Sequence, residues 1–124
     1  MYLSPEGIER PDTVDARSDV YALGAVGYFL LTQKPPFEGA SVIEICMQHV
    51  NATPVRPSER ASRNISGNLE DILLACLAKK PQERPQSMAE LRDALMSCTL
   101  GGEWTSATAD TWWANNGTTL ITGK

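Results

Sequence analysis

Residues 20–31 read Val-Tyr-Ala-Leu-Gly-Ala-Val-Gly-Tyr-Phe-Leu-Leu, an uninterrupted apolar and aromatic run that decides the fold. A run of this length favours a helix over a buried strand. Because no side of this helix is polar, we expect it to be the central helix of its domain, surrounded by other elements. Asp15 and Ser18 are both suitable caps for its start. Gly24 and Gly27 should permit neighbouring elements to approach closely.

Three further helices are expected, over residues 41–50, 66–80 and 87–100, each beginning at a serine. The first and the last of these serines are followed three positions later by glutamate, which is the capping-box spacing. Residues 1–12 and 53–63 are rich in proline and are expected to be irregular. The sequence therefore predicts an all-α fold, with four main helices around one buried apolar helix.

The composition excludes several classes of protein. The chain has 124 residues, of which 42% are hydrophobic, and 11 basic against 15 acidic residues give a net charge of −4. This balance argues against nucleic-acid binding and against a polybasic membrane anchor. The longest uncharged stretch, residues 20–33, is too short to cross a membrane. Three widely spaced cysteines and one histidine indicate no metal site, and we expect free, buried or half-buried thiols.

Two further features have simple expected roles. His49 falls near the end of a predicted helix, where we expect a solvated side chain that interacts favourably with the helix dipole. Trp112 and Trp113 lie in a segment, residues 101–124, whose composition differs from the rest of the chain. We expect the tryptophans to lie on a short helix that packs on the domain, and their exposure would mark a partner site.

Four short motifs follow one another along the chain. Residues 2–6 read Tyr-Leu-Ser-Pro-Glu, and residues 12–24 lead from Asp-Thr-Val-Asp-Ala-Arg-Ser-Asp into the apolar run. Residues 32–37 read Thr-Gln-Lys-Pro-Pro-Phe, and residues 80–85 read Lys-Pro-Gln-Glu-Arg-Pro. In this order the motifs resemble the large lobe of eukaryotic-type protein kinases, in the form found in bacterial serine/threonine kinases. The resemblance extends from residue 2 to about residue 98.

The resemblance implies roles for the structural motif Ser4, Pro5 and Glu6. In the family, the residues that match Glu6 and Arg84 form a largely buried ion pair, and the residue that matches Asp19 accepts hydrogen bonds from the backbone of the catalytic loop. The alternatives are ordinary ones, because Glu6 and Arg84 could be separate surface charges. Asp19 could simply be an acidic residue at a helix start.

The resemblance also implies a substrate platform. Tyr2 and Leu3 match the family's loop that meets the substrate residue following the phosphorylated serine or threonine. The alternative is that both side chains only pack against the protein.

The chain departs from the family's pattern at three positions. Ser4 replaces an alanine, which is a change between small residues. Gln33 replaces a glycine, so we expect a backbone without positive φ in that turn. Lys80 replaces an aspartate, so we expect the loss of a hydrogen-bond anchor near Arg84.

Kinases also need a glycine-rich phosphate loop, a His-Arg-Asp catalytic loop and an Asp-Phe-Gly metal site, and none of these occurs in the sequence. The resemblance therefore implies a C-terminal kinase fragment with no catalytic, cofactor-binding or metal-ligating residue of its own. On this interpretation Met1 occupies an internal position of the domain, residues 1–100 are an incomplete kinase domain, and residues 101–124 lie outside the resemblance. Part of the surface of residues 20–31 should then be exposed, which would make the chain prone to association.

The intact parent would transfer the γ-phosphoryl group of ATP, with Mg²⁺, to a serine or threonine of a protein substrate. Its other partner would be the missing N-terminal kinase portion, and its expected location is the cytoplasm, with any membrane anchor elsewhere in the parent. Two alternatives stay open. One is a non-catalytic, pseudokinase-like module that binds a partner through residues 41–50 and the tryptophan tail, and the other is an unrelated all-α binding domain.

Overall fold

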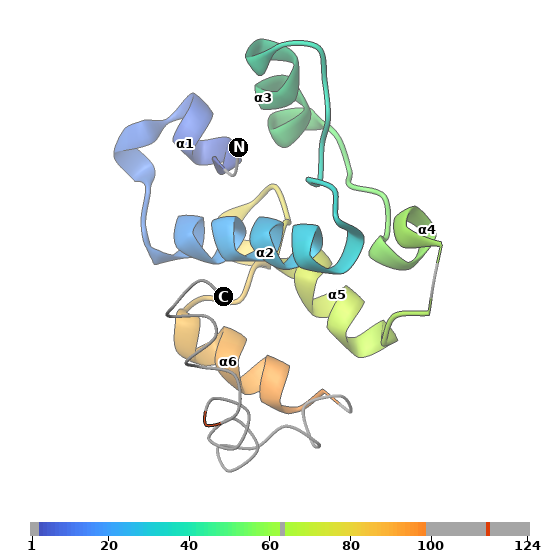
Figure 1. The fold of residues 1–124 in the computed structure, drawn as a ribbon. Helices are drawn as coiled ribbons and strands as arrows, with labels where there is room; N and C mark the ends of the chain where they lie inside the picture. Colours follow the sequence, from blue (N-terminus) through green and yellow to red (C-terminus); the bar gives the residue numbers. More distant parts are fainter. Residues whose placement is uncertain (1–2, 63, 99–113, 115–124) are drawn as a thin grey trace.

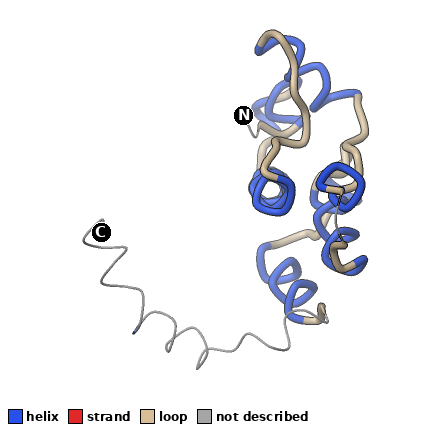
Figure 2. Tube along the Cα trace, turned by 45° about the vertical axis from the view of Figure 1, so that its right-hand side comes forward, coloured by secondary structure: helices blue, strands red, loops and turns tan. Residues whose placement is uncertain are grey.

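The structure is a computed structural model, which describes residues 3–62, 64–98 and 114. Within these ranges it is helical and contains no strand, which confirms the all-α expectation (Figures 1 and 2). The elements in chain order are α1 (Pro5–Glu9), η1 (Pro11–Thr13), α2 (Ala16–Thr32), α3 (Val42–Asn51), α4 (Pro57–Ala61), α5 (Gly67–Cys76), η2 (Pro81–Glu83) and α6 (Met88–Met96).

The apolar run forms α2, the central helix of the fold. Asp15 caps its start by accepting a hydrogen bond from the backbone N–H of Arg17 at 2.9 Å, so Asp15 rather than Ser18 is the cap. The helix packs against α4, α5 and α6, while α1 and α3 lie together at the far end of the molecule (Figure 1). Its core face buries Tyr21, Ala25 and Tyr28.

Two glycines of α2 lie where the helix packs against α5. A Cβ atom added at Gly24 would lie 2.6 Å from the Cβ atom of Cys76. A Cβ atom added at Gly27 would lie 2.6 Å from Cδ2 of Leu73. At Gly24 the two helices therefore approach more closely than a larger residue would allow, as expected from the sequence, whereas at Gly27 the side chain of Leu73 can move aside.

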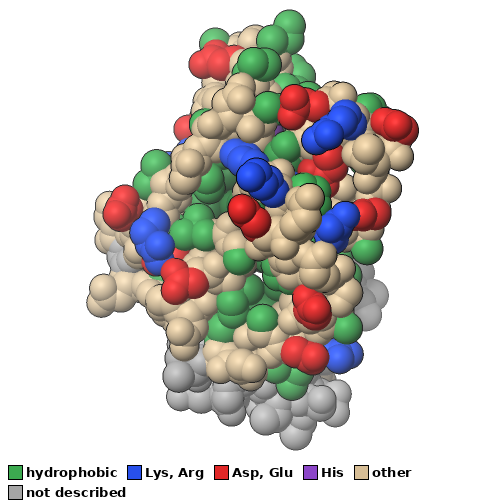
Figure 3. Space-filling view, turned by 180° about the vertical axis from the view of Figure 1, so that it is seen from behind, with side chains coloured by type: hydrophobic (Ala, Val, Ile, Leu, Met, Phe, Trp, Pro, Cys, Tyr) green, Lys and Arg blue, Asp and Glu red, His purple; other side chains and the backbone are tan. Residues whose placement is uncertain are grey.

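The opposite face of α2 is open. Leu30 is 64% exposed, and Leu23 and Val26 are also exposed. These side chains line an apolar groove of about 280 Å³ between α2, α5 and α6. The expectation that protein surrounds α2 on all sides is thus wrong for this chain, whereas the expected exposure of part of its surface is confirmed. From behind, Figure 3 shows hydrophobic side chains at the surface between scattered acidic and basic ones.

The predicted capping boxes form. Ser41 and Ser87 accept hydrogen bonds from the backbone N–H groups of Glu44 and Glu90, each at 3.1 Å. Ser66 precedes α5, but its side chain makes no capping hydrogen bond. Helices α5 and α6 end at Cys76 and Met96, earlier than expected.

Two segments expected to be irregular contain short helices. Residues 1–12 include α1, and residues 53–63 include α4, each with proline in its first turn, where the missing N–H costs no hydrogen bond. The position of α4 is fixed from a distance by Glu70, which is buried in α5. Glu70 accepts a hydrogen bond from the backbone N–H of Ser58 at 2.7 Å and one from Nη2 of Arg56 at 2.8 Å. Burial raises the pKa of Glu70, but these hydrogen bonds outweigh it, so the pKa falls below its usual value.

The turn after α2 corrects the expectation for Gln33. This residue has φ of 61°, in the left-handed region, and its N–H bonds to the carbonyl oxygen of Phe29 at 2.7 Å. The chain reverses sharply at the end of α2, and a left-handed residue at that position satisfies a helix carbonyl. Glutamine therefore adopts the left-handed conformation in this turn, contrary to the expectation of a backbone without positive φ.

His49 is also placed differently from the expectation. It is only 1% exposed, and its Nδ1 atom lies 2.6 Å from the hydroxyl oxygen of Tyr21. The ring of Phe37 packs edge-on against it, with centroids 4.9 Å apart. The imidazole thus joins α3 to the central helix, because long-range packing rather than the helix end sets its environment.

The burial of the cysteines agrees with the expectation of buried or half-buried thiols. Cys76 and Cys98 are buried, Cys46 is partly buried, and none of the three forms a disulfide. No helix in the described ranges is long and apolar enough to cross a membrane. Trp112 and Trp113 lie outside the described residues.

Candidate functional site

The site centres on an ion pair between Glu6 in α1 and Arg84 after η2. Nη1 of Arg84 donates to Oε2 of Glu6 at 2.7 Å, and Nη2 donates to Oε1 at 2.8 Å. Both residues are buried. The planar guanidinium therefore holds both carboxylate oxygens at once, the geometry in which such a pair is strongest.

The remaining N–H groups of the Arg84 guanidinium also donate hydrogen bonds. Nε of Arg84 donates to the carbonyl oxygen of Ala78 at 2.8 Å, and Nη1 donates to that of Arg17 at 3.0 Å. Nη2 reaches the carbonyl oxygen of Lys79 at 3.3 Å. The hydrogen-bond anchor expected to be lost at Lys80 is thus supplied by backbone carbonyls.

Two neighbours that the motifs did not single out complete the site. Ser18 donates its hydroxyl to Oε2 of Glu6 at 2.6 Å, and the ring of Tyr21 lies under the guanidinium of Arg84, 4.9 Å from centroid to Cζ. Such an arrangement adds a cation–π attraction to the ion pair. The available sequence signal was position, because both residues lie within the motif of residues 12–24, in the first turns of α2.

Electrostatics keep this carboxyl group ionised. Burial raises the pKa of Glu6, but hydrogen bonds from Arg84 and Ser18 lower it by a larger amount. The resulting pKa is about 2. A carboxylate that is ionised and hydrogen-bonded through both oxygens is not available as a general base. The pair therefore positions the chain rather than performing chemistry.

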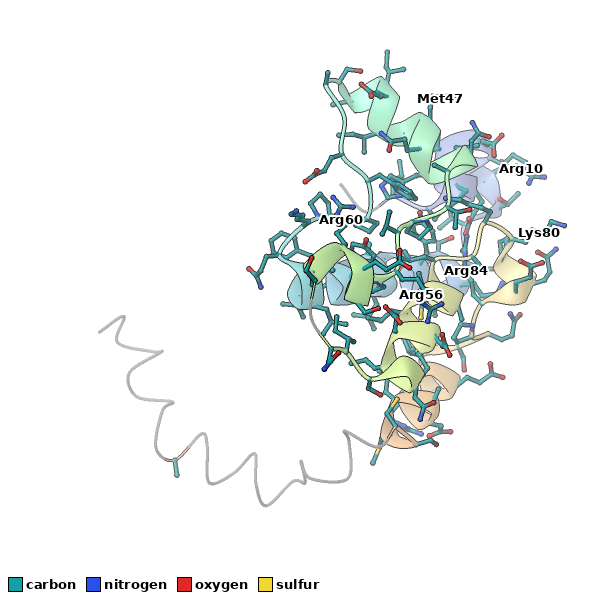
Figure 4. All side chains as sticks on the ribbon, turned by 90° about the vertical axis from the view of Figure 1, so that its right-hand side faces the viewer. Arg10, Met47, Arg56, Arg60, Lys80 and Arg84 are labelled. Atoms are coloured by element: carbon teal, nitrogen blue, oxygen red, sulfur yellow. The ribbon has the colours of Figure 1, made fainter. Side chains whose placement is uncertain are left out.

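The short helix α1 is positioned by the residues just before Glu6. Ser4 is buried and accepts a hydrogen bond from the backbone N–H of Gly7 at 3.1 Å, and Pro5 occupies the first helical position. This cap directs the carboxylate of Glu6 towards Arg84, which Figure 4 shows inside the body of the molecule.

Not every predicted site residue joins this cluster. Asp19 is exposed on α2, and no described residue makes a hydrogen bond or an ion pair with its carboxylate. Leu3 is 43% exposed, and Tyr2 lies outside the described residues. Ser4, Pro5, Glu6 and Arg84 are brought together, whereas Asp19 is not.

Lys79 is a further residue that the motifs did not single out. Its ammonium donates to the carbonyl oxygen of His49 at 2.7 Å and lies 4.6 Å from the ring centroid of Phe37. Burial and then the repulsion of Arg84 lower its pKa to about 8. Lys79 thereby connects the end of α3 to the loop that carries the ion pair.

No group of residues in the described ranges is arranged to hold a metal ion. The arrangement joins α1, the start of α2 and the loop before α6 through one buried arginine. The site is therefore a structural cluster that holds these three segments of the helical domain together.

The family to which the chain is similar agrees with the motifs. The family described as protein kinase domain matches residues 1–96. This match covers well over half of the chain, and the chain belongs to the protein kinase family.

The relatives are bacterial serine/threonine kinases. The serine/threonine-protein kinase PknB of Mycobacterium leprae is 50% identical over 96 residues, which are 77% of this chain and 15% of the relative. PknB of Mycobacterium tuberculosis is 48% identical over the same shares. A probable serine/threonine-protein kinase of Streptomyces coelicolor, SCO3848, is 42% identical over 109 residues, which are 88% of this chain and 16% of that protein. The chain thus spans about one sixth of the length of these relatives.

Proposed function

We propose that this chain forms the lower, C-terminal part of the large lobe of a serine/threonine protein kinase. The observation that carries the proposal is the buried pair of Glu6 and Arg84, which lie in two of the four motifs through which the sequence resembles the family. The match to the protein kinase domain supports it. Residues 1–100 would be the kinase portion, and residues 101–124 a separate tail.

In the intact parent, this portion would supply the structural floor and the substrate platform. Tyr2 and Leu3 would meet the substrate residue after the phosphorylated serine or threonine, and the exposure of Leu3 is compatible with such contact. The ion pair would keep this platform in place, because α1 follows it directly in the chain.

Asp19 would accept hydrogen bonds from the backbone of the catalytic loop. Its position supports this role, since it lies in the first turn of α2 with an exposed carboxylate that is free to accept further hydrogen bonds. The partner of the exposed apolar face of α2 would likewise be the N-terminal kinase portion.

The parent would use ATP with Mg²⁺, which neutralises the charge that develops on the transferred phosphoryl group. The 124-residue chain contains no glycine-rich phosphate loop, no His-Arg-Asp and no Asp-Phe-Gly, so it would neither bind the nucleotide nor transfer phosphate. We place the kinase portion in the cytoplasm, with any membrane anchor in another part of the parent.

The experiment compares the 124-residue chain with a chimera that joins residues 1–98 to the preceding kinase segment of the PknB relative. Incorporation of ³²P from ATP into a generic protein substrate should occur with the chimera and not with the 124-residue chain. In the chimera, Asp19→Asn should lower kcat strongly with little change in melting temperature. Phosphorylation by the 124-residue chain alone, or full activity of the Asp19→Asn chimera, would contradict the proposal.

A second candidate is a non-catalytic interaction module, and the open apolar face of α2 and the exposed side chains of α3 favour it. In α3, Ile43 is 77% exposed, and Val42 and Met47 are exposed as well. The coding sequence upstream of Met1 separates the two candidates. A frame that encodes His-Arg-Asp and Asp-Phe-Gly supports the kinase, and a genuine start signal after a stop codon supports the module.

A further inference from the structure

A second pocket lies on the outer side of the ion pair, between the end of α1 and the turn η2. Its volume is about 480 Å³. Most of the residues that line it are polar or charged, among them Glu9, Arg10, Thr13, Lys79 and Lys80. Leu3 is not among the described residues that line this pocket, so a ligand bound here would be distinct from the proposed contact of Leu3 with substrate.

Several charges in the pocket wall are already neutralised. Glu6 is held by Arg84, and Nη2 of Arg17 lies 2.9 Å from Oδ2 of Asp15. Glu6 and Arg17 therefore form part of the pocket wall, but their charges are balanced by those of their partners.

The remaining charges are predominantly positive. Arg10 and Lys80 are exposed, and neither side chain forms an ion pair or a hydrogen bond with a described residue. Lys79 is hydrogen-bonded only to backbone carbonyls, so its positive charge also has no carboxylate partner within the described residues. Among the described residues that line the pocket, three cations thus face one unpaired carboxylate, that of Glu9.

Two of these cations, Arg10 and Lys80, lie on the same side of the molecule. Figure 4 shows Arg10 at the end of α1 and Lys80 beside η2 on the same edge of the molecule, with both side chains directed outward. A guanidinium and an ammonium that share one pocket are the groups that bind a phosphate, the first through paired hydrogen bonds and the second as a point charge. This concentration of positive charge stands out in a chain with a net charge of −4.

We propose that the pocket between α1 and η2 binds the phosphate of a phosphorylated serine or threonine in a peptide, with Arg10 and Lys80 as the principal contacts. A peptide is favoured over a nucleic acid because the positive charge is confined to one pocket of an acidic protein and does not form a stripe along the surface. The mixed lining of the pocket, with Pro5, Pro81 and Thr13 beside the cations, suits a phosphate together with the adjoining peptide backbone.

The test measures fluorescence anisotropy of a fluorescein-labelled phosphoserine peptide titrated with the 124-residue chain, beside the same peptide without phosphate. The phosphopeptide should bind about tenfold more tightly, and the difference should shrink with added salt. Arg10→Gln and Lys80→Gln should each reduce phosphopeptide affinity several-fold. Arg92→Gln is the matched control, because Arg92 is an exposed arginine on α6 that pairs with Asp93.

Arg10 and Lys80 are exposed, so these variants should melt like the parent, which circular dichroism checks. Equal affinity for the two peptides would overturn the proposal, as would an equal loss of affinity in Arg10→Gln and Arg92→Gln. Displacement of the peptide by inorganic phosphate at the affinity of the phosphopeptide itself would reassign the pocket to a free anion. Tighter binding of a single-stranded oligonucleotide than of the phosphopeptide would also overturn it.

Discussion

Arg84 and Glu6 are 78 positions apart in the sequence, yet the guanidinium of Arg84 holds both oxygens of the Glu6 carboxylate at 2.7 and 2.8 Å. Both side chains are buried, so neither charge is compensated by water if its partner is removed. Removal of either partner would therefore leave a buried charge without its counter-charge.

Removal of one partner should be strongly destabilising. Arg84→Met leaves a buried carboxylate without its cation and should lower the free energy of unfolding by about 3–5 kcal/mol, measured by urea denaturation. If Arg84→Met does not fold, Glu6→Gln supplies a milder comparison, because it keeps the shape of the side chain. Arg92→Met, at an exposed pair, should leave the stability essentially unchanged. Equal stability of Arg84→Met and Arg92→Met would contradict the expectation.

Stability should also fall in acid because of Glu6. Its pKa is about 2 in the folded chain and 4.5 without its partners, so the folded state binds fewer protons between these values. The free energy of unfolding then rises with pH across this interval, and the contribution of Glu6 is lost as pH falls from about 5 towards 2. Urea midpoints measured across this range should show a shallower dependence in Glu6→Gln. A slope that is unchanged in this variant would contradict the assignment.

Two glycines in α2 should respond differently to the same substitution. Gly24→Ala brings a methyl group within 2.6 Å of Cβ of Cys76, which can move only with its helix, and should destabilise by about 1–3 kcal/mol. Gly27→Ala meets only the end of the Leu73 side chain, which can rotate, and it gains about 1 kcal/mol of helix propensity. Gly27→Ala should therefore be close to neutral in urea denaturation, and the reverse order would contradict the packing of α2 on α5.

The left-handed turn at residue 33 offers a stabilising change. Gln33→Gly should raise the free energy of unfolding by up to about 1 kcal/mol, because glycine adopts φ of 61° without steric cost. Gln33→Ala should give no such gain, since alanine meets the same steric cost as glutamine. The shift of the urea midpoint at constant slope measures both effects. A gain for alanine equal to that for glycine would show that backbone strain is not the cause.

Loss of the buried Tyr21 hydroxyl should destabilise the fold more than loss of an exposed hydroxyl. Tyr21→Phe removes the contact of 2.6 Å to Nδ1 of His49 and leaves a buried ring nitrogen with less hydrogen bonding, at a cost of about 1–3 kcal/mol. Ser97→Ala, which removes an exposed hydroxyl just after α6, should have little effect. Thermal unfolding of the two variants checks the comparison, and an unaltered Tyr21→Phe would mean that this contact does not stabilise α3.

Local signals were enough to predict most of the helices. Ser41 and Ser87 each precede a glutamate by three residues, and a capping box needs only that short span to form. The apolar run of residues 20–31 likewise specified a helix and its central place. Helix α4 was missed because its position depends on Glu70, which is remote in the sequence.

Some residues of the candidate site could be predicted from the sequence, and others could not. The motifs identified Glu6 and Arg84, but the hydroxyl of Ser18 and the ring of Tyr21 around them became apparent only in the structure. The environment of His49 was wrongly expected to be solvent, because a helix end seen in isolation gives no indication of what packs on it.

The sequence by itself determined the helical class, the central helix and the family, because periodicity, capping and motif order are properties of neighbouring residues. Only the tertiary structure decided which charges are buried, which turn is left-handed and which face of α2 stays open. These features arise where segments far apart in the chain pack together. The energy of a buried ion pair or of a close glycine contact depends on the burial and the distances that this packing creates.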